Sequence, residues 1–216
     1  MRQSRSISLH AGSAPAMHAL GRALGNALGS ALDEAPRGGG ALVIGLEGEL
    51  GTGKTTLVQG ALQALGVRGV IRSPTYTLIE PYEAAGRRLY HLDLYRLAQP
   101  DEIEALGLRD ALEDRAILLI EWPARGAGFL PPADLEISIE YRSAIECPRD
   151  GEGQGAAEGQ GAAEGQGAAE YQGGGDDLDP ADELHRPAGE GRMLCLRAGS
   201  PAGVRLIERF LAATSQ

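Results

Sequence analysis

The chain has 216 residues, which is enough for one well-buried domain and too few for a second domain of ordinary size. It carries 20 basic and 30 acidic residues, and its formal net charge is −10. Eleven of the acids lie in residues 148–190, so that this segment has a charge of −9 and the rest of the chain is nearly neutral. No basic stretch is present that would hold nucleic acid without a partner.

Two further features concern the compartment. Cys147 and Cys195 are the only cysteines, too few for a disulfide framework or a cysteine metal site, and we expect both to be free thiols. No apolar run has the length of a membrane span, and the first residues lack the apolar core of a signal peptide. The sequence therefore predicts a cytoplasmic protein without a membrane contact.

The first half of the chain predicts the order helix, strand, loop, helix. Ser13 is a favourable N-cap for a helix over residues 14–32, whose leucines recur at helical spacing. The apolar run over residues 41–47 predicts a buried strand that leads directly into a glycine-rich loop. Residues 55–65 then predict a second helix, which Gly66 closes.

The second half predicts several strands and a final helix. Its alternating segments and short apolar runs are bounded by turn residues, as strands of a sheet are. The elements that we expect are, in chain order, strands over 76–82 and 89–95 joined by the turn Ala84-Ala85-Gly86, short helices over 101–105 and 108–113, strands over 116–121, 135–141 and 193–197, and a last helix that begins at Ser200-Pro201.

The acidic segment 148–190 separates the last two predicted strands. Residues 153–170 are three copies of Gly-Gln-Gly-Ala-Ala-Glu, in which alanine is the only apolar side chain. Such a composition buries too little apolar surface to offset the entropy of ordering the chain. We expect an acidic, glycine-rich, disordered insertion in a folded domain that consists of residues 1–147 and 191–216.

The loop Gly48–Thr55 matches the pattern G-x-x-x-x-G-K-[ST] in full, between a predicted strand and a predicted helix. Glycines in such a loop let successive backbone N–H groups turn toward the phosphates of a nucleotide, beside the positive end of the helix. Lys54 would reach the β and γ phosphates, and the Thr55 hydroxyl would bind magnesium. We therefore expect ATP and magnesium as cofactors, with the nucleotide held by Gly51, Thr52, Gly53, Lys54, Thr55 and Thr56.

Lys54 is also the only lysine among the twenty basic residues. The chain uses arginine at every other position of positive charge, and it has a lysine at the one place where a slim amine on a flexible stem suits phosphates. This coincidence is independent of the glycine spacing. The alternative, a glycine-rich turn without a ligand, explains neither feature.

Two acidic residues are candidates for the chemistry at the phosphates. Glu121 ends the most apolar run of the chain, where a second magnesium ligand is needed at a neighbouring strand tip; the alternative is a strand-end acid that faces solvent. His91, Asp93 and Tyr95 share one face of a predicted strand. Asp93 could position the attacking water or a magnesium-bound water, and a polar edge of a hairpin is an equally good interpretation.

Two short segments complete the set of candidates. The hydroxyl-rich run over residues 73–77 follows the loop's helix and could approach the γ-phosphate, or it could simply begin a strand. Trp122-Pro123 directly follows Glu121, where it could shield the site or cap the sheet.

Taken together, these motifs resemble the TsaE (YjeE) family of bacterial P-loop proteins, from about Leu20 to Tyr141 and again in the final helix. The resemblance depends on four segments in this order and spacing: Gly51-Thr52-Gly53-Lys54-Thr55-Thr56, Ser73-Pro74-Thr75-Tyr76-Thr77-Leu78, His91-Leu92-Asp93-Leu94-Tyr95-Arg96 and Glu121-Trp122-Pro123. The acidic repeats are not part of the family's pattern.

The resemblance implies an ATPase that works with the TsaB and TsaD subunits to place threonylcarbamoyl on the adenosine beside the anticodon, in tRNAs that read codons beginning with A. It implies magnesium on Thr55 and Glu121, catalytic roles for Asp93 and Lys54 in ATP hydrolysis, and a switch-like loop over residues 73–77. Contact with tRNA would be indirect, through the complex.

The expected fold is one α/β domain of the P-loop type, with a mostly parallel sheet, an antiparallel edge and helices on both faces. Two other functions stay open at this point. A small-molecule kinase of the P-loop class would need an arginine-bearing lid, and the insertion offers only Arg149 and Arg186. A non-catalytic switch that binds ATP would need the same loop and metal as an ATPase.

Overall fold

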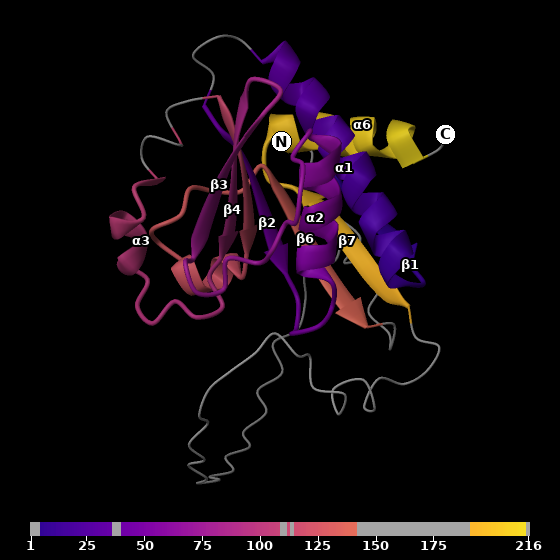
Figure 1. Ribbon diagram of the computed structural model, residues 1–216. Helices are drawn as coiled ribbons and strands as arrows, with labels where there is room; N and C mark the ends of the chain where they lie inside the picture. Colours follow the sequence, from indigo (N-terminus) through magenta and orange to yellow (C-terminus); the bar gives the residue numbers. More distant parts are fainter. Residues whose placement is uncertain (1–4, 36–39, 109–111, 113–114, 142–190, 215–216) are drawn as a thin grey trace, which may run out of the picture. The chain divides into compact units, whose positions relative to one another are not determined.

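The computed structural model describes residues 5–35, 40–108, 112, 115–141 and 191–214, and within these residues one sheet of seven strands carries the fold (Figure 1). The strands are β1 (Ser6–Ala11), β2 (Leu42–Glu47), β3 (Ile79–Ala84), β4 (Arg87–Asp93), β5 (Ala116–Glu121), β6 (Leu135–Tyr141) and β7 (Arg192–Ala198). The helices are α1 (Ala14–Glu34), α2 (Lys54–Ala64), α3 (Glu102–Ala105) and α6 (Pro201–Thr214), with a 3₁₀ helix, η1 (Pro123–Gly126).

The strands follow the order β1-β7-β6-β2-β5-β4-β3 across the sheet. The four central strands β6, β2, β5 and β4 are parallel, and β3 on one side and β7 and β1 on the other are antiparallel to their neighbours. The α/β fold with a parallel centre is thus confirmed, with antiparallel strands at both edges. Because the carboxyl ends of parallel strands meet at one edge of a sheet, the segments that follow β2, β4, β5 and β6 gather there.

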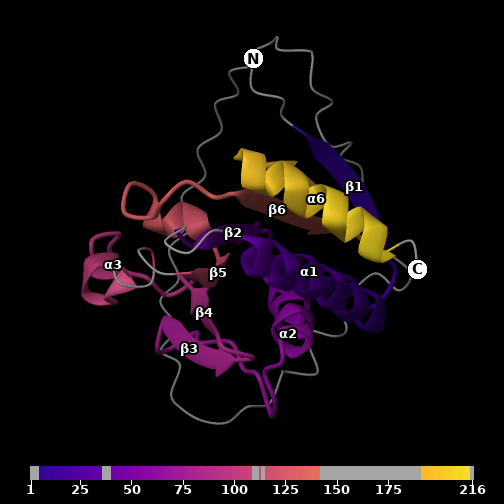
Figure 2. The same cartoon turned by 90° about the horizontal axis from the view of Figure 1, so that it is seen from above.

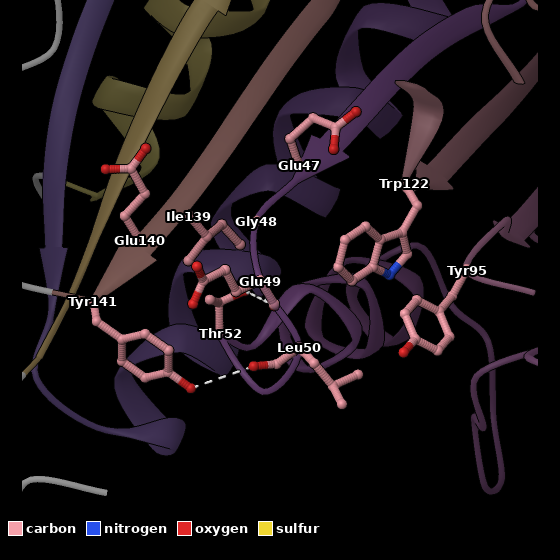
Figure 3. A pocket seen from close by; sticks show the side chains of 10 residues that line it. All are labelled: Glu47, Gly48, Glu49, Leu50, Thr52, Tyr95, Trp122, Ile139, Glu140 and Tyr141. Atoms are coloured by element: carbon pink, nitrogen blue, oxygen red, sulfur yellow. Dashed lines mark hydrogen bonds between the residues drawn. The ribbon is translucent and has the colours of Figure 1, made fainter. Parts of the chain in front are cut away.

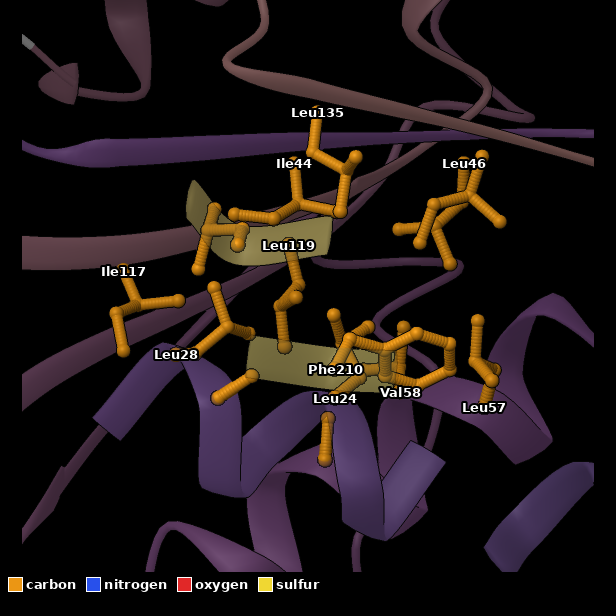
Figure 4. Close-up of a cluster of buried hydrophobic side chains, with 14 of the residues drawn as sticks. Leu24, Leu28, Ile44, Leu46, Leu57, Val58, Ile117, Leu119, Leu135 and Phe210 are labelled. Carbon is orange, nitrogen blue, oxygen red and sulfur yellow. The ribbon is translucent and has the colours of Figure 1, made fainter. Parts of the chain in front are cut away.

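Two apolar layers cover the two faces of the sheet. Helices α1, α2 and α6 pack on one face, and Figure 2 shows α3 on the other side of β4 and β5. The larger layer is close-packed around alternate side chains of the central strands and residues of the three helices (Figure 4), including Leu24, Leu28, Ile44, Leu46, Leu57, Ile117, Leu119 and Phe210. In the part of the chain that the structure describes, no helix is long and apolar enough to cross a membrane.

Helices α1 and α2 lie in backbone contact. A Cβ atom at Gly25 of α1 would come within 2.3 Å of the carbonyl oxygen of Ala61 in α2, and one at Gly21 within 2.2 Å of the oxygen of Leu57. Glycines at these positions therefore let α2, the helix that carries Lys54, approach α1 more closely than any side chain would allow.

Most predicted elements are present with bounds shifted by a few residues. Ser13 caps α1 as expected, since its Oγ accepts a hydrogen bond from the N–H of Ala16 at 3.2 Å. The turn between β3 and β4 narrows to Ala85 and Gly86, whose φ angles of 51° and 68° suit a two-residue hairpin loop. The helix predicted over residues 108–113 lies largely outside the described residues.

Two sequence predictions differ from the structure on the β7 side. Strand β1 was not predicted; it pairs with β7 from Ser6 opposite Arg197 to Ala11 opposite Arg192. The prediction of a free thiol is wrong for Cys195, which is disulfide-bonded. Cys147 and the insertion 148–190 lie outside the described residues.

The disulfide of Cys195 could not be expected from the sequence, because two cysteines that are far apart along the chain do not by themselves predict a pair.

Candidate nucleotide-binding site

The glycine-rich loop joins the carboxyl end of β2 to the first residue of α2, Lys54, as the motif requires. All three of its glycines, Gly48, Gly51 and Gly53, have positive φ angles that other residues rarely adopt. Gly48 has a φ of 148°, and a Cβ atom there would lie 2.4 Å from the carbonyl oxygen of Ile139; Gly53 has a φ of 102° and packs against Met17. The loop is therefore held tightly between β6 and α1.

Lys54 lies inside this loop, with 4% of its surface exposed. Its Nζ donates hydrogen bonds to the carbonyl oxygens of Gly48 at 2.7 Å and Glu49 at 2.8 Å, and it lies 3.9 Å from the ring centre of Trp122. Burial lowers the pKa of the Lys54 ammonium below its ordinary value, and the nearby carboxylates, Glu121 foremost, partly offset this shift.

Glu121, at the end of β5, connects two of the candidate residues. The Oγ1 of Thr55 donates to Oε2 of Glu121 at 3.0 Å, and Nε2 of His91 lies 2.8 Å from Oε1. Glu121 is 2% exposed, so that the alternative of a solvent-facing acid is wrong. Both oxygens of one buried carboxylate thus have a defined partner.

The Thr55 and Glu121 oxygens fit a magnesium ion by chemistry and by spacing. Magnesium prefers oxygen ligands in an octahedron with bonds of about 2.1 Å, which puts adjacent ligand oxygens about 3.0 Å apart. The Thr55 Oγ1 to Glu121 Oε2 distance is 3.0 Å. Two protein oxygens are also the usual number where phosphates and water supply the other ligands.

Asp93 ends β4 and is directly opposite Glu121 in the register of β4 and β5. Its Oδ2 accepts hydrogen bonds from the hydroxyls of Ser73 and, at 3.1 Å, Thr75, and these two hydroxyl oxygens lie 2.8 Å apart. Its Oδ1 accepts from the N–H of Tyr95 at 3.1 Å. The segment of residues 73–77 is therefore attached to the candidate site through Asp93, and β3 begins only at Ile79.

Trp122 follows Glu121 in a left-handed conformation, with a φ of 60°, that turns its ring over Lys54. Figure 3 shows the ring beside that of Tyr95, with 5.2 Å between their centres, and Tyr141 on the other side of the loop. These residues line a cavity of about 700 Å³ together with Glu47, Gly48, Glu49, Leu50, Thr52, Ile139 and Glu140. Of the two alternatives for Trp122, shielding of the site describes this position.

The structure brings the four chemically active candidates, Lys54, Thr55, Asp93 and Glu121, to one edge of the sheet. Thr52 is buried and its hydroxyl donates to the Glu49 carbonyl at 2.9 Å within the loop, whereas Thr56 is half-buried in the first turn of α2. The sequence reasoning placed His91 on this face without giving it a role. The alternation of His91 with Asp93 was the sequence signal that places both residues on one face. The contact of His91 with Glu121 could not be predicted, because it depends on the register between β4 and β5.

Comparison with known proteins agrees with the resemblance. The family model of TsaE, threonylcarbamoyl adenosine biosynthesis protein, matches residues 12–148. The tRNA threonylcarbamoyladenosine biosynthesis protein TsaE of Haemophilus influenzae is 52% identical over 101 residues, 47% of this chain and 64% of that protein. The protein of the same description from Bacillus subtilis is 40% identical over 98 residues, 45% of this chain and 61% of its own length. In both cases the match spans less than two thirds of the relative.

The fold has a counterpart among solved structures. The crystal structure of Bacillus subtilis YdiB superposes with a TM-score of 0.60 at 19% identity and covers 99% of each chain. The likeness of the two structures supports the fold, and the family model, which covers more than half of this chain, supports the relationship. The chain belongs to the TsaE family of threonylcarbamoyl adenosine biosynthesis proteins.

Proposed function

We propose that this protein binds ATP with magnesium and hydrolyses it slowly, as a subunit of the cytoplasmic machinery that forms threonylcarbamoyladenosine in tRNA. The observation that carries the proposal is the junction of four groups at one edge of the sheet: the Lys54 amine and Thr55 hydroxyl at the start of α2, and the Glu121 and Asp93 carboxylates at adjacent strand ends. An amine, a hydroxyl and two carboxylates around a glycine loop are the groups that phosphoryl transfer uses.

Each group has a distinct task in this proposal. Lys54 stabilises negative charge on the β and γ phosphates, and backbone N–H groups from Gly51 to Thr56 hold their oxygens. Thr55 and Glu121 hold magnesium, which neutralises phosphate charge when bound. Asp93 orients the attacking water. Its carboxylate is held in place for this task by hydrogen bonds from hydroxyl and N–H donors on the segments around it.

The cellular role rests on family membership and on charge. Family membership supports action in tRNA modification, for which we propose TsaB and TsaD as partners. Outside residues 148–190 the chain has a net charge of only −1, so we expect weak binding of the isolated protein to tRNA. Contact with tRNA would then be indirect, through the complex.

Substitution of Lys54 tests the proposal at the loop. Lys54→Ala removes the amine, and Lys54→Arg keeps a positive charge but replaces a slim amine by a broad guanidinium. A charge-assisted hydrogen bond contributes about 1.5–3 kcal/mol, so we expect Lys54→Ala to weaken magnesium–ATP binding roughly 10- to 100-fold in titration calorimetry. We expect Lys54→Arg to recover little of the loss, because the guanidinium does not fit the space between the Gly48 and Glu49 carbonyls and Trp122.

A second measurement separates the cellular role from nucleotide binding. Reconstitution with TsaB, TsaD, ATP and the threonylcarbamoyl donor should modify tRNA over many turnovers with the wild type and fail with Lys54→Ala. Unchanged ATP affinity in Lys54→Ala would refute the nucleotide site. Normal ATP binding together with modification that proceeds equally well without this protein would refute only the role in tRNA, and would favour phosphate transfer to a small molecule.

A further inference from the structure

His91 is the one buried candidate-site residue to which the proposed chemistry gives no task. It lies on β4 with 0% of its surface exposed, on the sheet face that α2 covers. Its Nε2 lies 2.8 Å from Oε1 of Glu121, and its Nδ1 is buried without a hydrogen-bond partner among the described residues. The only polar contact that the structure gives this ring is therefore to Glu121.

A buried histidine at this position lowers the stability of the folded protein, so its one hydrogen bond, to Glu121, needs a functional explanation. A buried polar atom without a partner destabilises the folded state by about 1–3 kcal/mol, and a leucine would fill the same space without that cost. The neighbours of His91 on β4, Leu89 and Leu92, are buried leucines in the two apolar layers. The position therefore suits an apolar residue in every respect except the distance to Glu121.

The Glu121 carboxylate needs a partner on each side to stay in one orientation. Oε2 accepts from Thr55, and the hydrogen-bond partner of Oε1 is the buried His91. A carboxylate oxygen accepts hydrogen bonds, so Nε2 of His91 is the donor to Oε1. Without this donor the buried Oε1 loses its partner, and the carboxylate gains by turning toward Thr55 or Lys54.

We propose that His91 is a positioning residue that fixes Glu121, so that Oε2 is presented to the magnesium ion beside Thr55. The inference rests on the proposed function, in which Thr55 and Glu121 hold the metal. Groups that hydrogen-bond a metal ligand from behind commonly change metal affinity 10- to 100-fold when they are removed. His91 would then act on magnesium through Glu121 and would leave the contacts of ATP with the loop unchanged.

Three substitutions of His91 separate this role from packing. His91→Leu keeps the volume and removes the donor. His91→Gln places an amide N–H near the position of Nε2, within reach of Glu121, whereas His91→Asn places its amide near Nδ1, out of reach. The measurement is the affinity for ATP by titration calorimetry, in excess chelator and across a magnesium titration, with the melting temperature of each variant as a check on folding.

We expect His91→Leu and His91→Asn to raise the magnesium concentration required for tight ATP binding about 10- to 100-fold. The affinity in chelator should stay at the wild-type value, and His91→Gln should recover most of the loss. In the Glu121→Gln background, His91→Leu should have little further effect, because the two residues act as one unit.

Three results would overturn the inference: affinity in chelator that falls as much as affinity with magnesium, His91→Gln no better than His91→Asn, or a full effect of His91→Leu in the Glu121→Gln background. If the ATP affinity of the wild-type protein is the same with and without magnesium, the proposed metal site is overturned as well. A wild type that depends on magnesium, with His91 variants that do not differ from it, would overturn the role of His91 alone.

Discussion

The contact between α1 and α2 makes a sharp prediction about two glycines of the same helix. In Gly25→Ala, the new Cβ would lie 2.3 Å from the carbonyl oxygen of Ala61 and 2.9 Å from its Cα, both in the backbone of α2. In Gly29→Ala, one turn further along α1, the nearest atom would be the Cδ2 of Leu65 at 3.4 Å, the end of a flexible side chain. Both glycines are buried, so the pair differs mainly in what the methyl group meets.

The expected magnitudes follow from these contacts. A carbon atom approaches a carbonyl oxygen no closer than about 3.3 Å, so Gly25→Ala must move the two helices apart by about 1 Å. Overpacking of this kind costs about 1–3 kcal/mol or more, and the gain in helix propensity returns only about 1 kcal/mol. We expect a net loss of about 1–2 kcal/mol, or a melting temperature lower by roughly 2–8 °C for a chain of this size. Gly29→Ala should keep most of the propensity gain.

Calorimetric melting of both variants beside the wild type checks the difference, and ATP titration extends it to the site. Because α2 begins at Lys54 and Thr55, its displacement by about 1 Å should weaken ATP binding in Gly25→Ala and not in Gly29→Ala. A Gly25→Ala protein that melts at or above the wild-type temperature would refute the close helix contact. An equal loss of melting temperature in Gly25→Ala and Gly29→Ala would also refute it, because the loss would then not depend on which atoms the new methyl group contacts.

Two further substitutions test single side chains. Asp93→Asn should bind ATP nearly as the wild type does, since the amide oxygen can still accept from the Tyr95 N–H while the amide NH2 donates to the hydroxyls of Ser73 and Thr75, but turnover should fall about 100-fold or more; parallel loss of affinity and turnover would instead indicate a structural role. Asp134→Ala removes the acceptor of the Val43 N–H at 3.0 Å and of the Ser200 hydroxyl at 2.5 Å, and should cost about 1–3 kcal/mol in urea denaturation. Asp134→Asn keeps one acceptor and should cost less, and equal stability of the two variants would contradict this account.

Local sequence predicted the elements whose signal is local. Strand β5 matches its prediction from Ala116 to Glu121, because six consecutive buried residues leave no ambiguity of face or period. Strand β1 was missed because only two apolar residues, Ile7 and Leu9, alternate with polar residues there. The segment becomes a strand by pairing with β7, which lies far away in the sequence. The Gly21, Gly25 and Gly29 spacing of α1 was a visible signal of close helix contact that the leucine pattern concealed.

The residues of the candidate site follow from sequence motifs, and the contacts between them do not. The motif identifies Lys54 and Thr55 because the loop is contiguous in sequence. The pairing of His91 with Glu121 needs the register of β4 and β5, in which Asp93 lies opposite Glu121, and register is a property of the assembled sheet. The hydrogen bonds of Ser73 and Thr75 to Asp93 depend in the same way on where β3 begins.

The partners of Lys54 affect how any measurement at this residue is interpreted. In this structure the amine bonds the Gly48 and Glu49 carbonyls and lies against Trp122. Binding of phosphates would exchange these contacts for new ones, so affinity reports the difference between the two sets. Lys54→Ala removes both sets at once. The affinity that it loses is therefore a lower bound on the attraction between amine and phosphate.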